Sequence, residues 1–367
     1  MELLQWFPLT KRMASRNGGP SRLCNWGTSC ACRAPWATCR RFCLRGIGAA
    51  SAHGEAQHVG SRMRLVPLTR RRFRLVLAIF LAWQGTGLVM CPDETSFAEM
   101  RLPVSAQLLR SGSSVALQGL RPILPGHCLV VPERPVPRLR DLPEDAMLDL
   151  WRTTLQANQQ LLKQLGATAS NWAVFDGWQA GQPVQHTHVH VVPRKPKDLE
   201  RNDEVYEALE RWKPSEAEGG EPPPIAWPTD EARKKRDSEE MAAEAAGYRA
   251  LLPGESSFPA EQAFASFRIP RSHLFYASPS GLTVAFVNLK PLIPGHVLVV
   301  PRRTVPRLAD LSQEEFDDLF RSVRVVQGAL ESSYGAEASR LGIQDGLDAG
   351  QTVPHVHVHV LPIPAKL

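Results

Sequence analysis

Histidines alternate with apolar or β-branched residues in two short runs of this 367-residue chain. Residues 355–361 read HVHVHVL and residues 186–192 read HTHVHVV, and the two runs hold six of the eleven histidines. Successive side chains of a β-strand point to opposite faces, so the three imidazoles of each run would share one face. We predict two strands whose valines pack on a core and whose histidines line a surface or a cleft.

Three kinds of chemistry compete for these imidazoles. Metal binding requires ring nitrogens within ~2 Å of one ion, whereas the outer histidines of such a strand lie ~13 Å apart. Mere surface decoration does not explain why the pattern occurs twice behind the same loop. Phosphate chemistry fits best, because a central imidazole can act as a nucleophile while its neighbours orient it and donate to phosphate oxygens. We expect no metal bound by the protein at either run.

The two runs belong to two copies of one domain. Pro-Gly-His at residues 125–127 recurs at 294–296, and His186 recurs as His355, each 169 residues later. Repeats at a constant offset indicate an internal duplication. The sequence of each copy predicts the same order of elements. Two strands joined through the Pro-Gly turn come first, an amphipathic helix and a loop with Asp-Gly follow, and the histidine strand comes last.

The helix of each copy is predicted by apolar residues at helical spacing. In the second copy Ser312 and Glu315 form a capping box, and the apolar stripe consists of Phe316, Leu319, Phe320, Val323 and Val326. In the first copy the stripe consists of Met147, Leu150, Trp151, Leu155, Leu162 and Leu165. Strands grouped around one helix with short turns predict an α+β fold, with an antiparallel sheet and one packed long helix in each copy.

Composition divides the chain into four parts. Residues 1–92 hold fourteen Lys and Arg against two Glu, about +12, so the rest carries about −6 of the net +6. We predict a basic leader at residues 1–92, a first histidine domain at 93–212, a tail helix and linker at 213–260, and a second histidine domain at 261–367. Within the third part, the helix is expected from about Asp230 to Leu252 and the linker from Pro253 to Pro259.

The leader has the composition of a targeting peptide or a disordered extension. Its apolar run from Leu75 to Trp83 is shorter than the ~20 residues of a membrane-spanning helix and looks more like the core of a signal peptide. That role would fit a translation start at Met63, a hypothesis that N-terminal peptide sequencing tests; the alternative is an untargeted leader. The body has only Cys91 and Cys128, which suits a reducing compartment such as the cytoplasm. Its mildly acidic balance gives no reason to expect nucleic-acid binding.

The runs and their surroundings resemble the histidine triad superfamily, whose motif is His-x-His-x-His followed by two apolar residues. The closer resemblance is to its fragile histidine triad branch and covers roughly residues 95 to 367. The segments that carry it are QDGLDAGQTVP at 344–354, NLKP at 288–291, RND at 201–203 with Tyr206, and SEEMAAEAA at 238–246.

Members of that branch hydrolyse dinucleoside polyphosphates, typically diadenosine triphosphate to AMP and ADP, through a covalent nucleotidyl-histidine. The resemblance implies His357 as the nucleophile, with His188 as its counterpart. It also implies that Asn288 holds the ribose. The remaining substrate contacts that it implies are Gln344, Gly350, Gln351, Thr352, Val353, His355 and His359, with Gln182, His186 and His190 in the first copy. It implies no protein-bound cofactor, although a divalent cation, Mg or Mn, would accompany the substrate.

The first copy departs from the family pattern. Gly119 stands where Asn288 stands in the second copy, Phe175 stands where Gln344 stands, and Thr187 replaces a valine. Loss of a polar partner costs ~1–3 kcal/mol, so we expect the first site to be weaker, altered in substrate or inactive. Because family members are generally homodimers, we expect the two copies to pair within one chain as a pseudo-dimer.

Two other functions stay open. One is hydrolysis of nucleoside phosphoramidates or adenylyl sulfate, although Gln351 argues against the phosphoramidase branch. The other is a nucleotide sensor with slow turnover. Tyr206 lies where the family has a signalling tyrosine, but a lone exposed tyrosine usually has no such role. Saturable turnover would separate an enzyme from a sensor.

Overall fold

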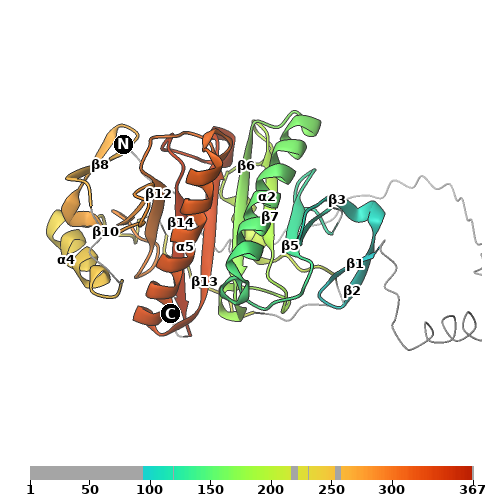
Figure 1. The fold of residues 1–367 in the computed structure, drawn as a ribbon, viewed down its shortest axis with the longest axis horizontal. Helices are drawn as coiled ribbons and strands as arrows, with labels where there is room; N and C mark the ends of the chain where they lie inside the picture. Colours follow the sequence, from blue (N-terminus) through green and yellow to red (C-terminus); the bar gives the residue numbers. More distant parts are fainter. Residues whose placement is uncertain (1–93, 119, 216–221, 230, 253–257, 366–367) are drawn as a thin grey trace, which may run out of the picture. The chain divides into compact units, whose positions relative to one another are not determined.

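The computed structural model describes residues 94–365 apart from 119, 216–221, 230 and 253–257 (Figure 1). The expected basic leader, with its apolar run and the hypothetical start at Met63, lies outside the described residues, as does most of the expected linker. Within the described part, no helix is both long and apolar enough to cross a bilayer. The thiol of Cys128 is free and buried.

The two copies contain the same elements in the same order. The first copy consists of β1 (Glu94–Phe97), β2 (Met100–Pro103), β3 (Gln107–Arg110), β4 (Ser114–Gln118), β5 (Cys128–Pro132), α2 (Glu144–Leu165), β6 (Ala169–Asp176) and β7 (Val189–Arg194). The second consists of β8 (Glu261–Phe264), β9 (Phe267–Pro270), β10 (Leu274–Ala277), β11 (Thr283–Val287), β12 (Val297–Pro301), α5 (Gln313–Tyr334), β13 (Ala336–Asp345) and β14 (Val358–Pro364). Between them lie α3 (Glu204–Glu210) and α4 (Ser238–Arg249).

The two copies share one antiparallel sheet. Ten strands are paired in the order β10-β11-β12-β14-β13-β6-β7-β5-β4-β3, and β13 of one copy pairs with β6 of the other from Ser339↔Asp176 to Asp345↔Ser170. This confirms the predicted α+β fold of two duplicated units. The hairpins β1–β2 and β8–β9 form two small separate sheets, and sequence reasoning did not anticipate them.

The Asp-Gly loop of each copy lies against the other copy. Gly177 and Gly346 have φ values of 104° and 103°. A Cβ at Gly177 would lie 2.9 Å from the Cβ of Ala338, and one at Gly346 would lie 2.9 Å from the Cβ of Ala169. Both the left-handed backbone and the close approach require glycine, which explains the repeat of this loop in the sequence.

Helices α2 and α5 both pack on the shared sheet (Figure 1). The rings of Trp151 and Phe320 stack between them at 4.0 Å. The capping box of Ser312 and Glu315 is present, and the left-handed Gly335 ends α5. The valines that alternate with histidines, Val189, Val191, Val356, Val358 and Val360, lie in the same buried cluster as most residues of the helix stripes. This confirms that their face of the strand packs on the core.

Helix α4 is shorter than expected and lies on the second copy. It begins at Ser238 rather than at Asp230, because the side chain of Asp237 accepts from the backbone N–H of Glu240 and the side chain of Glu240 accepts from that of Asp237. This capping box fixes the start of the helix. Although α4 follows the first copy in the chain, it packs against β10 and β11 of the second.

Candidate active site

The second histidine triad, His355, His357 and His359, lies where the chain enters β14. The strand begins at Val358, so only His359 lies in it and the prediction that one strand carries all three histidines is wrong here. It is equally wrong for the first triad, His186, His188 and His190, of which only His190 lies in β7. The reason is local hydrogen bonding. The N–H of Val356 donates to the carbonyl of Val305 in a loop at 2.7 Å, whereas pairing with β12 begins only at Val358.

Neither triad lines an open surface, because all six histidines are at most 1% exposed. The ring of Phe264, at the end of β8, lies 5.4 Å from the rings of both His355 and His357. In the first copy, Phe97 at the end of β1 lies 5.3 Å from His186 and 5.4 Å from His188. The two unanticipated hairpins therefore cover the triads.

The tautomer of His357 follows from its hydrogen bond. Its Nδ1 lies 2.7 Å from the carbonyl oxygen of His355, and a carbonyl can only accept, so Nδ1 carries the proton. Nε2 then holds a lone pair, and it is buried without a hydrogen-bond partner. A neutral imidazole with a free Nε2 lone pair is the form that attacks an electrophile.

In each copy a histidine outside the triad contacts the last histidine of the triad through a ring nitrogen: His296 contacts His359, and His127 contacts His190. The N–H of Leu292 donates to Nδ1 of His296 at 3.1 Å, so the proton of neutral His296 is on Nε2. That atom lies 2.9 Å from Nδ1 of His359, which places the proton of His359 on Nε2. His127 and His190 repeat the contact at 3.1 Å. Sequence reasoning noted Pro-Gly-His only as a repeat; the recurrence of a histidine there was the signal for a site residue.

Burial keeps these imidazoles neutral. It lowers the pKa of His357 and of His188 from 6.5 to about 4, against the opposing effect of the hydrogen bonds to His355 and His186. The pKa of His296 is lowered to about 3, chiefly by burial and further by the positive charges of Arg233 and Arg236. Desolvation disfavours the charged form of an imidazole, so the nucleophilic form of His357 persists at neutral pH.

The two predicted glutamines of the phosphate loops are bonded to backbone. Oε1 of Gln351 accepts from the N–H of Gly346 at 2.8 Å, and its Nε2 donates to Pro306 and His355 carbonyls at 3.0 and 3.3 Å. In the first copy Gln182 likewise accepts from the N–H of Gly177 and donates to the carbonyl of Pro137, but its third bond goes to the carbonyl of Val184. Both amides therefore fix the loop that leads into the triad, and their direct contact with phosphate stays a prediction.

The predicted site residue Asn288 lies beside the histidine pair. Its Nδ2 is 3.2 Å from Nε2 of His296, and its Oδ1 accepts from the N–H of Lys290 at 2.9 Å. Among the other predicted residues, Val353 is buried and Thr352 is exposed. A contact between Asn288 and a ribose stays a prediction.

The first copy reaches into the second site through Tyr206. This tyrosine is 1% exposed, so the expectation of a lone exposed side chain is wrong. Its hydroxyl accepts from Nδ2 of Asn171 at 2.9 Å, and the same Asn171 nitrogen donates to the carbonyl of Ala349 at 2.9 Å. The amide of Gln344 is also hydrogen-bonded to Tyr206. Tyr206 became buried because β13 and β6 pair, which the linear sequence does not display.

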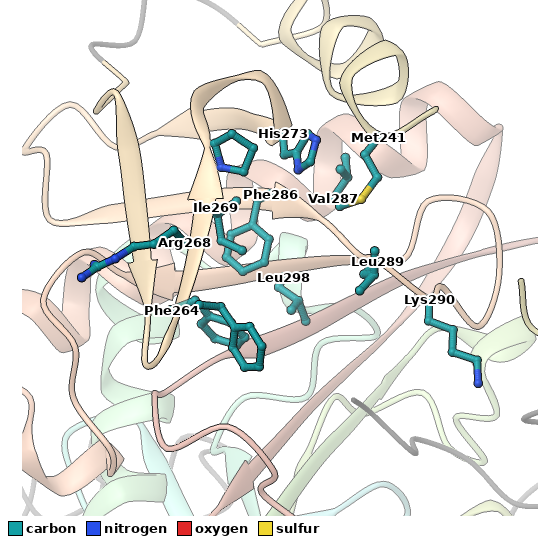
Figure 2. A pocket seen from close by; sticks show the side chains of 12 residues that line it. Met241, Phe264, Arg268, Ile269, His273, Phe286, Val287, Leu289, Lys290 and Leu298 are labelled. Atoms are coloured by element: carbon teal, nitrogen blue, oxygen red, sulfur yellow. The ribbon is translucent and has the colours of Figure 1, made fainter. Parts of the chain in front are cut away.

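An apolar cavity of about 240 Å³ lies beside the second triad (Figure 2). It is lined from β8, β9, β11 and β12 and by Met241 of α4, and Phe264 both lines it and contacts His357. Figure 2 shows the charged side chains of Arg268 and Lys290 on opposite sides of the apolar ones. The apolar lining consists mainly of Phe264, Phe267, Ile269, Phe286, Leu289 and Leu298. Sequence reasoning missed these residues, because apolar strand residues are also typical of a core.

The segment before α4 adds positive charge near the second triad. The guanidinium of Arg236 donates through Nε to the carbonyl of Asn288 at 3.1 Å and is paired with Glu244. Nη1 of Arg233 donates to the carbonyl of Lys290 at 3.4 Å. Among the described residues, no group of three or more His, Cys, Asp or Glu side chains could hold a metal ion.

These two covered histidine triads on duplicated α+β units define a class of protein. The family model of the HIT domain matches residues 105–197 and 271–365, just over half of the chain. The chain belongs to the HIT domain family, as a tandem duplication of the fragile histidine triad branch.

Curated relatives resemble this chain over about one hundred residues. The bis(5'-nucleosyl)-tetraphosphatase [asymmetrical] of Schizosaccharomyces pombe is 57% identical over 104 residues, which are 28% of this chain and 56% of that protein. The bifunctional bis(5'-adenosyl)-triphosphatase/adenylylsulfatase FHIT of Arabidopsis thaliana is 50% identical over 107 residues, 29% of this chain and 58% of that one. The matches thus span little more than half the length of these relatives. The crystal structure of the C. elegans NitFhit protein aligns at a TM-score of 0.29 with 49% identity, over 31% of this chain and 27% of that one.

Proposed function

We propose that this protein is a dinucleoside polyphosphate hydrolase and that its second copy carries the reaction. The observation that supports this most is the free Nε2 lone pair of His357, held by the bond from Nδ1 to the His355 carbonyl. The relatives are named as hydrolases of such substrates, and the cavity beside Phe264 offers an apolar place for a nucleoside.

The chemistry would proceed in two transfers at the α-phosphorus. Nε2 of His357 attacks that phosphorus, a P–N bond forms, and the P–O bond to the leaving nucleotide breaks. With diadenosine triphosphate the products are ADP and an adenylyl group on His357. Water then attacks the same phosphorus, the P–N bond breaks, and AMP leaves while His357 returns to its neutral form. The covalent intermediate divides one difficult hydrolysis into two easier steps.

His359 would assist both transfers. Because His296 holds its Nδ1, its Nε2–H would donate to a phosphate oxygen or to the oxygen of the leaving nucleotide. Donors that are positioned before the reaction stabilise charge as it develops. Phe264 covers His357 in this conformation, so the hairpin β8–β9 would have to move outward to admit the substrate.

A divalent cation, Mg or Mn, would arrive as part of the substrate. The polyphosphate carries several negative charges, whereas the triad and the loop glutamines are neutral. Arg233, Arg236 and Lys290 lie around Asn288 and would supply part of the compensation. We propose that the cation would enter with the polyphosphate, would offset part of its negative charge and is not a resident cofactor.

The single chain would work as a pseudo-dimer. β13 and β6 already join the copies into one sheet, so the junction needs no second chain. Light scattering should give the mass of one chain; an obligate dimer of two chains would contradict this proposal.

Product analysis tests the function. The protein is incubated with diadenosine triphosphate, diadenosine tetraphosphate or adenylyl sulfate in the presence of Mg, and products are separated by anion-exchange chromatography. We expect AMP with ADP or ATP from the two dinucleotides, at rates that saturate. Quenching with alkali during turnover of a substrate radiolabelled in the adenosine should trap an alkali-stable, acid-labile adenylyl group on the peptide that contains His357. Cleavage of adenylyl sulfate alone would favour the sulfatase alternative, and tight binding with no turnover would favour a sensor.

A further inference from the structure

The cavity of the second copy has a filled counterpart in the first. Six apolar side chains that line the cavity have equivalents at the same positions of the matching strands and of the loop after β4 or β11. In the second copy they are Phe264, Phe267, Ile269, Phe286, Leu289 and Leu298. In the first copy they are Phe97, Met100, Leu102, Leu117, Leu120 and Leu129. All six first-copy residues pack in one apolar cluster, and that cluster also contains Trp212.

Trp212 follows α3 and lies over the first triad. Its indole ring is 4.8 Å from the ring of His190, 5.7 Å from that of His188 and 6.1 Å from that of His127. The side chain is only 6% exposed. These contacts place the indole at the nucleophile of the first copy and at the histidine pair behind it.

Hydrogen bonds fix the indole in this position. Nε1 of Trp212 donates to the carbonyl of Arg121 at 3.1 Å and to that of Leu120 at 3.3 Å. The equivalents of these two residues in the second copy, Leu289 and Lys290, line the open cavity. The indole thus bonds to the same part of the fold that is free to receive a ligand in the other copy.

We propose that Trp212 occupies the nucleoside place of the first copy, so that this copy is a purine-nucleotide site kept closed by its own chain. Indole and purine are both flat fused bicycles of nearly equal size, and both can stack on apolar side chains. Each also has an N–H that can donate to a carbonyl, the ring N–H of indole or the exocyclic amino group of adenine. This inference rests on the proposed function in one respect, since it takes the second cavity as the nucleoside pocket.

A site blocked by Trp212 explains how the first copy can keep all three histidines and still be closed to substrate. His188 has the same Nδ1 bond to the His186 carbonyl, at 2.8 Å, and its Nε2 is likewise buried without a hydrogen-bond partner. His188 therefore has the same tautomer as His357, and the indole of Trp212 lies where a substrate would have to approach it. An occupant tethered to the same chain acts at a high effective concentration, so dissolved nucleotide competes poorly with it.

Nucleotide stoichiometry tests the proposal with the full chain and AMP as the probe. Equilibrium dialysis with radiolabelled AMP should give one AMP per chain for the unmodified protein and two for Trp212→Ala. The matched control is Trp178→Ala, because Trp178 belongs to the same copy and is 38% exposed; it should keep one AMP per chain. Circular dichroism checks that both variants are folded, and Trp212→Leu, which keeps more apolar volume, replaces Trp212→Ala if that variant unfolds.

Photolabelling assigns the sites. Irradiation with 2-azido-AMP should label only second-copy peptides of the unmodified protein and peptides of both copies in the Trp212 variant. One AMP per chain in the folded variant, or a labelled first-copy peptide in the unmodified protein, would overturn the inference and leave the proposed function standing. No AMP bound by any form would overturn the proposed function and this inference with it.

Discussion

Nδ1 of His357 donates to the carbonyl oxygen of His355 at 2.7 Å, and this one bond turns the lone pair of Nε2 away from the backbone. Replacing His357 by Asn removes that lone pair while keeping a polar side chain. If the second copy is the working site, kcat should fall at least about a thousand-fold, because the nucleophile is lost.

The control for this change is His188→Asn in the first copy. It should leave kcat with diadenosine triphosphate within about two-fold of the unmodified value. Release of AMP, followed by chromatography, is the measurement. A large loss from His188→Asn together with full activity of His357→Asn would move catalysis to the first copy.

The pair of His296 and His359 supports a second prediction. His296→Leu removes the partner of Nδ1 of His359, so His359 can adopt the tautomer that no longer donates from Nε2. The loss of about one hydrogen bond, ~1–1.5 kcal/mol, should lower kcat roughly ten-fold. His296→Gln retains an N–H at that end and should recover part of the rate, whereas equal losses in the two variants would indicate a packing role only.

Arg236 tests the contribution of the segment before α4. Arg236→Gln removes the charged donor to the Asn288 carbonyl and the ion pair with Glu244. Because a hydrogen bond from a charged group contributes ~1.5–3 kcal/mol, kcat/KM should fall roughly ten-fold or more. Lys234→Gln is the matched control, since Lys234 lies two residues before Arg236 and forms only an exposed ion pair with Glu240. This change should alter kcat/KM less than about two-fold. Equal effects of the two changes would contradict a specific role for Arg236.

Two equivalent arginines make different contributions to stability. Arg138 pairs with Asp176 at 3.0 Å and with Glu331 at 2.6 Å, and all three side chains are at most 9% exposed. Its counterpart Arg307 pairs with Asp345 at 3.0 Å but is 31% exposed. Removing one partner of a buried ion pair costs ~3–5 kcal/mol. Urea unfolding should therefore show a clearly larger loss for Arg138→Ala than for Arg307→Ala, and equal losses would argue against burial as the cause.

Stability should also fall in mild acid. Burial lowers the pKa of His188 and of His357 from 6.5 to about 4. Below pH 6.5 the unfolded chain therefore binds protons that the folded chain does not, so the stability that these histidines contribute is complete above that pH and is lost as the pH falls toward 4. Each of these two histidines contributes up to about 3 kcal/mol. Urea unfolding at pH 7 and at pH 4.5 measures this, and His188→Asn should reduce the difference; equal free energies of unfolding at the two pH values would contradict it.

The local sequence predicted those features that depend on residues near one another in the chain. The constant offset between Pro-Gly-His repeats predicted the duplication. The spacing of Phe316, Leu319 and Phe320 predicted the stripe of α5, because residues three and four apart share one helix face. The alternation of valine with histidine predicted which face enters the core, although the strand itself begins later than expected.

Contacts between distant segments were beyond that kind of reasoning. Tyr206 reads as an exposed tail residue until β6 and β13 pair and bury it beside Gln344. The sequence places a tail helix and linker between the two copies but does not show which copy the helix contacts, and α4 packs on the second. Because of that placement, Met241 lines the cavity and Arg236 donates to the carbonyl of Asn288.

The sequence by itself determined that two histidine triads exist, that each follows an Asp-Gly loop and a long helix, and that the second keeps more of the polar residues that its family uses. Only the tertiary structure decided that Phe264 borders an open cavity while Trp212 fills its counterpart. The physical reason is that a motif is written in neighbouring residues, whereas the occupant of a pocket comes from wherever the folded chain brings an apolar side chain close enough to exclude water.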